Sequence, residues 1–101
     1  MDMPADTIVE KNARAAYRRL GDDSGAVILH LDTAAYHSIN ESGAAIWALI
    51  EDGITFGTLL ERVGSRFEVP HADLEQDLRD FLKSLNERDL VDLNSVDLNL
   101  A

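Results

Sequence analysis

Hydrophobic and polar residues alternate in the first half of the chain in a way that predicts short β-strands. In residues 26–31 (AVILHL), Val27, Leu29 and Leu31 fall on one face, while the residues between them fall on the other. Residues 32–34 are expected to turn the chain, and residues 35–39 to return antiparallel. Residues 13–20 are expected to add an edge strand, although helix propensity also allows a helix there.

After residue 39 the apolar positions change to a helical period. No obvious strand follows, so we expect the edge of the hairpin to be open. Asn40 is placed to cap a first helix over residues 41–51, which Gly53 would end in a left-handed conformation. Thr55 is placed to cap a second helix. Its apolar stripe consists of Phe56, Leu59, Leu60, Val63 and Phe67.

A third helix is expected to contain Pro70 in its first turn and to run to about Arg88. Its apolar face would consist of Leu74, Leu78, Phe81, Leu82 and Leu85. Residues 90–93 would close against the core. The pattern predicts an α+β domain over residues 13–93, in which a three-stranded antiparallel sheet is followed by three helices. Residues 1–12 are expected to form a flexible arm, and residues 94–101 a flexible tail.

Composition limits the classes of function. The 101 residues are enough for one domain with a modest core, and they contain no cysteine. Disulfides, thiolate metal sites and cysteine nucleophiles are therefore excluded, and a reducing cytoplasm fits. The acidic start of the chain does not resemble a secretion signal, and no apolar run is long enough to span a membrane.

The charge argues against nucleic acid and anionic lipid as partners. Nineteen acidic and nine basic residues give a formal net charge of -10, which repels phosphate. The short connection between the second and third helices resembles a helix-turn-helix. However, residues 68–92 contain eight acidic and three basic side chains, whereas a DNA-reading element is expected to be basic.

No catalytic or metal-binding constellation is evident. The histidines, His30, His37 and His71, do not have metal-ligand spacing with one another or with carboxylates. His37 and Ser38 are neighbours on a predicted strand, so their side chains point to opposite faces and cannot act as a base–nucleophile pair. We therefore expect a non-enzyme with no metal and no cofactor.

Acidic side chains gather at the start of the third helix. The helix dipole accounts for Asp73 and Glu75 in the first turns. It accounts less well for Asp77 and Asp80, which lie further along. We interpret these as a solvated face or as a contact to a basic peptide.

Two motifs resemble the PqqD-like family. Residues 36–47 (YHSINESGAAIW) resemble its pattern Y-x-x-L-N-x-x-G-A-x-I-W. Residues 77–91 (DLRDFLKSLNERDLV) resemble its pattern D-V-x-x-F-L-x-x-L-x-x-x-G-L-L. The chain departs from the family at Asp89 and at Ala35, where glycine is usual. Asp tolerates a left-handed backbone better than most residues do.

The resemblance implies a winged helix-turn-helix fold that recognises the leader segment of a ribosomally made, post-translationally modified peptide. In such domains the leader adds a strand to the third strand and lies in a groove against the third helix. Carried onto this chain, the expected peptide-binding residues are Ala35, Tyr36, His37, Ser38, Ile39, Leu74, Asp77, Leu78, Phe81, Leu82 and Leu85.

The leading functional hypothesis is a non-catalytic adaptor that presents a precursor to modifying enzymes. A leader peptidase and/or cyclase of lasso-peptide biosynthesis is the favoured partner. The alternative is a PqqD-type chaperone for a radical SAM enzyme in pyrroloquinoline quinone synthesis. A winged-helix regulator and a small enzyme are less favoured. Because leader peptides are often basic, Asp73, Asp77 and Asp80 are expected to pair with cationic residues of the leader.

Overall fold

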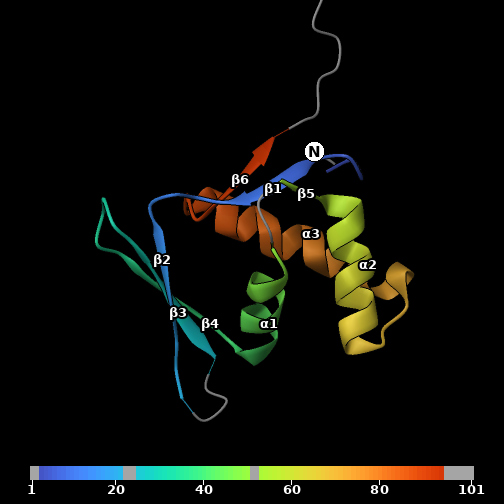
Figure 1. Cartoon of the computed structure of the whole chain (residues 1–101), viewed down its shortest axis with the longest axis horizontal. Helices are drawn as coiled ribbons and strands as arrows, with labels where there is room; N and C mark the ends of the chain where they lie inside the picture. The colour runs from blue at the N-terminus through green and yellow to red at the C-terminus, as the bar shows by residue number, and fades with distance from the viewer. Residues whose placement is uncertain (1–2, 22–24, 51–52, 95–101) are drawn as a thin grey trace, which may run out of the picture.

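The computed structural model describes residues 3–21, 25–50 and 53–94, and these form two small sheets and three helices (Figure 1). The first sheet has the strand order β2-β3-β4. Its strands are β2 (Ala15–Arg19), β3 (Ala26–His30) and β4 (Tyr36–Ile39), and both pairings are antiparallel. The predicted edge strand, hairpin and alternation of faces are confirmed, since Ala26, Ile28 and His30 are buried.

The second sheet is the main departure from the sequence prediction. It has the order β5-β1-β6 and consists of β1 (Ile8–Lys11), β5 (Ile54–Thr55) and β6 (Val91–Asn94). The expectation of a flexible arm over residues 1–12 was therefore wrong for the described residues. Val9 is completely buried, and β1 pairs along its whole length with β6, which lies at the other end of the chain.

Side chains fix the first residues to the rest of the fold. The guanidinium of Arg79 donates to the carbonyl oxygen of Met3 at 3.2 Å, and the Asn12 amide donates to Asp92 at 3.0 Å. Both contacts join residues far apart in sequence, which a local pattern cannot reveal. Residues 95–101 of the expected tail lie outside the described residues, and Asn94 ends β6.

The three helices are α1 (Glu41–Leu49), α2 (Phe56–Phe67) and α3 (His71–Glu87). The predicted caps are confirmed: the Asn40 side chain accepts from Gly43 N–H at 2.8 Å, and Thr55 Oγ1 accepts from Thr58 N–H at 3.2 Å. Helix α1 ends at Leu49 rather than at residue 51. Gly53 is left-handed (φ 76°) but lies beyond the helix end, so it is not its immediate cap.

The end of α3 shows how Asp89 replaces the glycine usual in the family. Asp89 adopts a left-handed conformation (φ 59°), and its N–H donates to Asn86. The next N–H, from Leu90, donates to the carbonyl oxygen of Leu85 at 2.9 Å. This pair of bonds is a Schellman motif, and Leu85 and Leu90 supply its buried hydrophobic contact. The chain can therefore turn from α3 into β6.

The core lies where the helices pack against both sheets (Figure 1). The largest side chains with almost no exposure come from every layer, and they include Phe56, Ile28, Leu59, Leu78 and Leu82. Tyr17 of β2 stacks on Trp47 of α1 with ring centroids 5.8 Å apart, which attaches the first sheet to α1. Among the described residues, no helix combines the length and apolarity needed to cross a bilayer.

Candidate functional site

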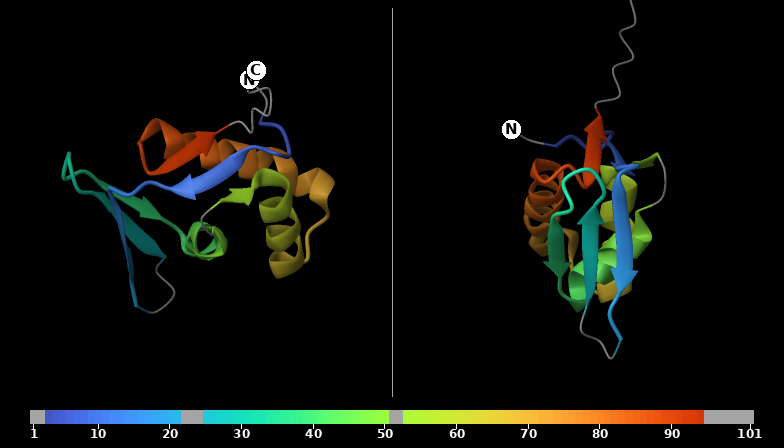
Figure 2. Two further views of the ribbon diagram at one scale, coloured as in Figure 1. Left: turned by 45° about the horizontal axis from the view of Figure 1, so that its top comes forward. Right: turned by 90° about the vertical axis from the view of Figure 1, so that its left-hand side faces the viewer.

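Strand β4 is an open edge of the first sheet. Figure 2 (right) shows it between β3 and α3, and no strand of the described residues pairs with its other side. His30 N–H donates to the Ala35 carbonyl oxygen at 3.0 Å. This bond shows which residue pairs of the β3–β4 hairpin are hydrogen-bonded and which are not. His37 and Ile39 therefore exchange bonds with β3, while the backbone groups of Tyr36 and Ser38 point toward the open edge.

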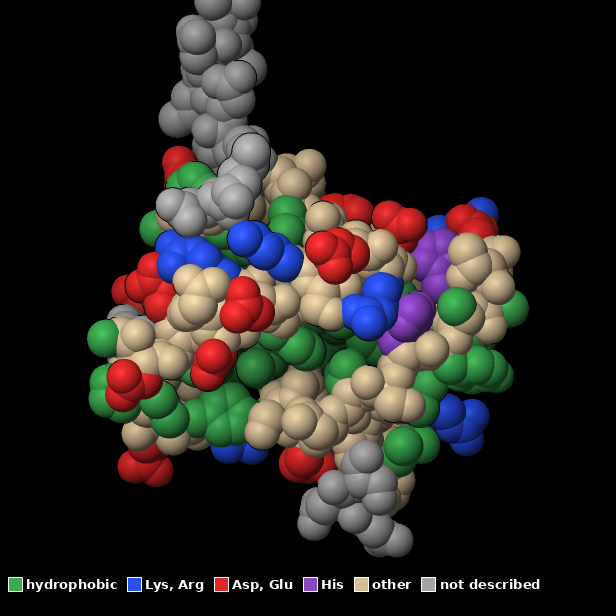
Figure 3. Space-filling model, turned by 180° about the vertical axis from the view of Figure 1, so that it is seen from behind, with side chains coloured by type: hydrophobic (Ala, Val, Ile, Leu, Met, Phe, Trp, Pro, Cys, Tyr) green, Lys and Arg blue, Asp and Glu red, His purple; other side chains and the backbone are tan. Residues whose placement is uncertain are grey.

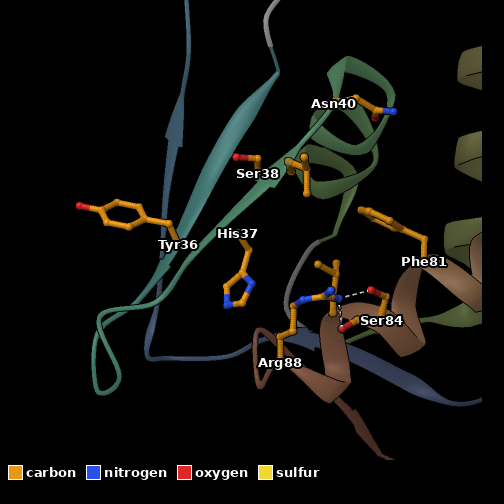
Figure 4. A pocket seen from close by; sticks show the side chains of 9 residues that line it. Tyr36, His37, Ser38, Asn40, Phe81, Ser84 and Arg88 are labelled. Carbon is orange, nitrogen blue, oxygen red and sulfur yellow. Dashed lines mark hydrogen bonds between the residues drawn. The ribbon is translucent and has the colours of Figure 1, made fainter.

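A groove of about 480 Å³ lies between this edge and α3 (Figures 3 and 4). In Figure 4, the His37 side chain points from β4 toward α3, whereas Tyr36 and Ser38 point away. Ile39, two residues beyond His37, lies on the same face as His37. The groove is lined by Tyr36, His37, Ser38, Ile39, Asn40, Phe81, Ser84, Leu85 and Arg88.

The wall opposite β4 is one face of α3. Phe81, Ser84, Leu85 and Arg88 recur at helical spacing, so they share a side of the helix. Arg88 Nη1 donates to the Ser84 carbonyl oxygen at 3.1 Å and also to the Ser84 hydroxyl. These bonds hold the guanidinium along the α3 wall, while His37 enters the same groove from β4 (Figure 4).

Gly43 of α1 lies against both walls of the groove. A Cβ added at Gly43 would lie 3.2 Å from Ile39 Cβ and 3.2 Å from Phe81 Cε1. The missing side chain therefore lets α1 approach β4 and α3 closely. The Asn40 cap that binds Gly43 N–H fixes this approach, so the Asn-x-x-Gly spacing seen in the sequence positions the groove.

The electrostatics of the groove differ from those expected from the sequence. Among the described residues, its lining contains Arg88 and His37 and no carboxylate. Asp73, Asp77 and Asp80 of α3 are exposed but do not line it. Within the described residues, no three acidic or histidine side chains converge as a metal site would require. The arrangement offers hydrogen-bond donors and an apolar wall rather than acid–base chemistry.

Six of the sequence-predicted site residues line the groove: Tyr36, His37, Ser38, Ile39, Phe81 and Leu85. Leu78 and Leu82 do not, because they are 1% and 0% exposed and belong to the core. Leu74 packs partly against that core, and Asp77 is exposed outside the groove. Ala35 precedes β4 and contributes its carbonyl oxygen to β3.

Sequence reasoning missed three lining residues, Asn40, Ser84 and Arg88. Asn40 was assigned only a capping role. Ser84 and Arg88 follow Phe81 by three and seven residues, which is a helical period that would have found them.

A second hollow, of about 460 Å³, lies on the outer face of the same sheet. Tyr36, 72% exposed, lines both hollows and so connects them at the β4 edge. The other residues that line it are Ala16, Tyr17, Arg18, Leu20, Val27 and Leu29.

The sequence matches the profile of the family described as coenzyme PQQ synthesis protein D (PqqD) over residues 25–91. The chain belongs to the PqqD family. The match runs from the start of the β3–β4 hairpin to the first residue of β6. It therefore contains both walls of the groove, and it confirms the resemblance found in the two sequence motifs.

Two solved structures resemble this PqqD-family chain. One is described as TbiB1 in complex with the TbiA(beta) leader peptide. It is 28% identical, with a TM-score of 0.71, over 82% of this chain and 94% of that one. The other is described as lasso peptide synthetase B1 complexed with the leader peptide. It is 23% identical, with a TM-score of 0.67, over 82% and 95% of the two chains, and supports the fold alone.

These likenesses confirm the predicted α+β fold with its antiparallel sheet and three helices. No curated protein sequence matches the chain.

Proposed function

We propose that this protein is a non-catalytic adaptor that binds the leader segment of a ribosomally synthesised precursor peptide. The observation that carries the proposal is the open β4 edge beside a groove that α3 completes. This combination suits an extended peptide, because edge groups supply backbone hydrogen bonds and a neighbouring groove receives alternate side chains. Membership of the PqqD family and the 28% identical, leader-bound structural neighbour support the same function.

In this proposal, the backbone of β4 and the side chains of the groove make different contacts with the leader. The outward N–H and C=O groups of Tyr36 and Ser38 would bond to the leader and set its register. Phe81, Leu85 and Ile39 would bury an apolar side chain of the leader against α3. Burial contributes about 25 cal/mol per Å² of apolar surface, before the cost of ordering the peptide is subtracted.

We propose a leader peptidase and/or cyclase of lasso-peptide biosynthesis as the enzymes that receive the precursor. One of the two structural neighbours is named lasso peptide synthetase B1, and this name favours the choice. The alternative is a PqqD-type chaperone for a radical SAM enzyme in pyrroloquinoline quinone synthesis, which the family description favours. In both cases the precursor is made in the cytoplasm, where we expect this cysteine-free chain to act.

Amide hydrogen exchange tests the binding mode. The probe is a synthetic peptide that carries the leader sequence of a candidate precursor. We expect saturating peptide to slow exchange at the outward amides of Tyr36 and Ser38. The outward amides of the opposite edge, at Tyr17 and Arg19 of β2, serve as internal controls and should not change. Binding without protection of the β4 amides would contradict strand addition.

The enzyme partner is tested by adding this protein to assays of a purified candidate enzyme of each class. Faster leader cleavage by a peptidase in the presence of this protein would support the lasso assignment. Faster modification by a radical SAM enzyme, with no effect on a peptidase, would favour the alternative. Activity of the isolated protein on the precursor would contradict the adaptor role.

A further inference from the structure

The groove has the opposite charge character to the rest of the chain. The protein carries nineteen acidic residues and a formal net charge of -10. Nevertheless, His37 points into the groove from β4 and Arg88 lies along its α3 wall (Figure 4), and among the described residues no carboxylate lines it. Hydrogen-bond donors gathered in a groove of an acidic protein favour a ligand that carries a negative charge.

Arg88 has hydrogen-bonding capacity left. Both of its bonds to Ser84 come from Nη1, so within the described residues its Nε and Nη2 groups have no acceptor. Glu87 and Asp89 adjoin it in sequence, but neither lines the groove, and neither forms an ion pair with it in the described part of the chain. Two N–H groups of a guanidinium match the two oxygens of a carboxylate. The His37 ring can supply a further donor.

The apolar and cationic parts of the groove occupy different positions along β4. His37 faces the Arg88 end of α3, as Figure 4 shows. Ile39 faces the Phe81 end, because both lie next to Gly43. An added strand would direct every second side chain into the groove. Two side chains of the peptide, separated by one residue, would therefore reach these two parts.

We infer that the peptide recognised by this groove carries an acidic side chain opposite Arg88 and His37, with an apolar side chain two residues away opposite Ile39 and Phe81. The inference rests on the proposed function and specifies its ligand. A strand antiparallel to β4 would read apolar-x-acidic from its N-terminus. This replaces the expectation of a basic leader held by Asp77 and its acidic neighbours, because those carboxylates lie outside the groove.

Synthetic peptides of one strand-forming host sequence, differing at a single position, test the inference. The probes contain Leu-x-Glu, Leu-x-Gln or Leu-x-Lys, and fluorescence anisotropy gives the Kd of each. We expect the wild-type protein to bind the Glu peptide about tenfold more tightly than the Gln peptide, because a charge-assisted bond replaces a neutral one. The Lys peptide should bind most weakly.

Charge reversal in the groove provides the decisive comparison. Arg88→Glu should bind the Lys peptide more tightly than the Glu peptide, a reversal that general loss of structure would not produce. Arg88→Gln, which keeps a polar side chain, should lose the preference for Glu over Gln. Arg18→Glu on β2 makes the same charge change outside the groove. It should retain the wild-type order.

The outcomes separate this inference from the function on which it rests. If wild type binds the Glu and Gln peptides equally, or if Arg88→Glu retains the preference for Glu, the acidic ligand is overturned while strand addition stands. If wild type binds none of the peptides, both proposals are overturned. Circular dichroism of each variant establishes that the fold is intact.

Discussion

The first sheet has two edges, and they differ in how they meet solvent. Strand β2 carries Arg18 and Arg19, both exposed. Arg19 donates to Glu41 at 3.2 Å, and this carboxylate raises the pKa of Arg19. Strand β4 has the sequence Tyr-His-Ser-Ile and no permanently charged side chain. Charged side chains on an edge discourage pairing with another chain, so β2 is protected from pairing whereas β4 is available for it.

The difference teaches that an open edge is not in itself a binding site. Both edges present unpaired backbone groups, but in the described part of the chain it is β4 that faces α3 across a groove, whose far wall carries Phe81, Leu85 and Arg88. Backbone bonding on its own is insensitive to sequence, so specificity has to come from the wall that α3 supplies. Variants that alter one edge, or the residues that support it, therefore separate the backbone contribution to leader binding from the side-chain contribution.

The largest effect is expected where β3 begins beside the end of β4. Gly25 has φ 90°, and a Cβ there would lie 2.1 Å from the Ile39 carbonyl oxygen. Gly25→Ala should lower the free energy of unfolding by about 3 kcal/mol, because the backbone is left-handed and the clash is with main-chain atoms. Urea unfolding measures this. Gly21→Ala, in the same loop with nothing within 4 Å, is the control and should have little effect.

An intermediate effect is expected from removing one outward amide. Ser38→Pro leaves the bonds of His37 and Ile39 to β3 intact but removes a donor from the open edge. We expect leader affinity to fall at least about tenfold, which corresponds to one lost hydrogen bond. Isothermal titration calorimetry would detect it. Arg19→Pro removes an outward amide from β2 instead. Equal losses in both variants would mean that the two edges are equivalent.

The smallest effect concerns the two capped helices. Asn40→Ala and Thr55→Ala each remove a side-chain cap, and each should lower the free energy of unfolding by about 1 kcal/mol. Asn40 also lines the groove and fixes Gly43, whereas Thr55 lies outside the lining. We expect only Asn40→Ala to weaken leader binding. Thermal unfolding and peptide titration of both variants measure the two effects, and matched affinities would contradict a role for the cap in the groove.

The sequence predicts the elements that depend on local patterns. The hairpin, the two caps and the apolar stripes each follow from residues a few positions apart. The second sheet does not, because β5 has two residues and β1 pairs with β6, whose residues lie eighty or more positions away in the sequence. Such pairing is decided by packing and leaves no periodic signal in a four-residue strand.

The candidate site also has a part that local sequence patterns predict and a part that depends on packing. The β4 residues could be predicted because an edge is implied by the absence of a following strand. The groove wall could not be assigned in full, because an apolar stripe does not show which of its residues border the groove. Leu82 and Leu85 both belong to the core, but only Leu85 of this pair also lines the groove. Arg88 was missed because a charged residue at a helix end is ordinarily solvated.

The pairing of Ile8 with Asn94 brings the first and last strands of the domain into register beside one another. The chain therefore enters β1 and leaves β6 side by side, and neither Ile8 nor Asn94 lines the groove. A linker on this side of the fold that keeps residues 3–7, with new ends opened at an exposed turn, should give a circular permutant that retains the groove. The same layout suits genetic fusion to an enzyme, because the attached protein would not have to cross the recognition surface.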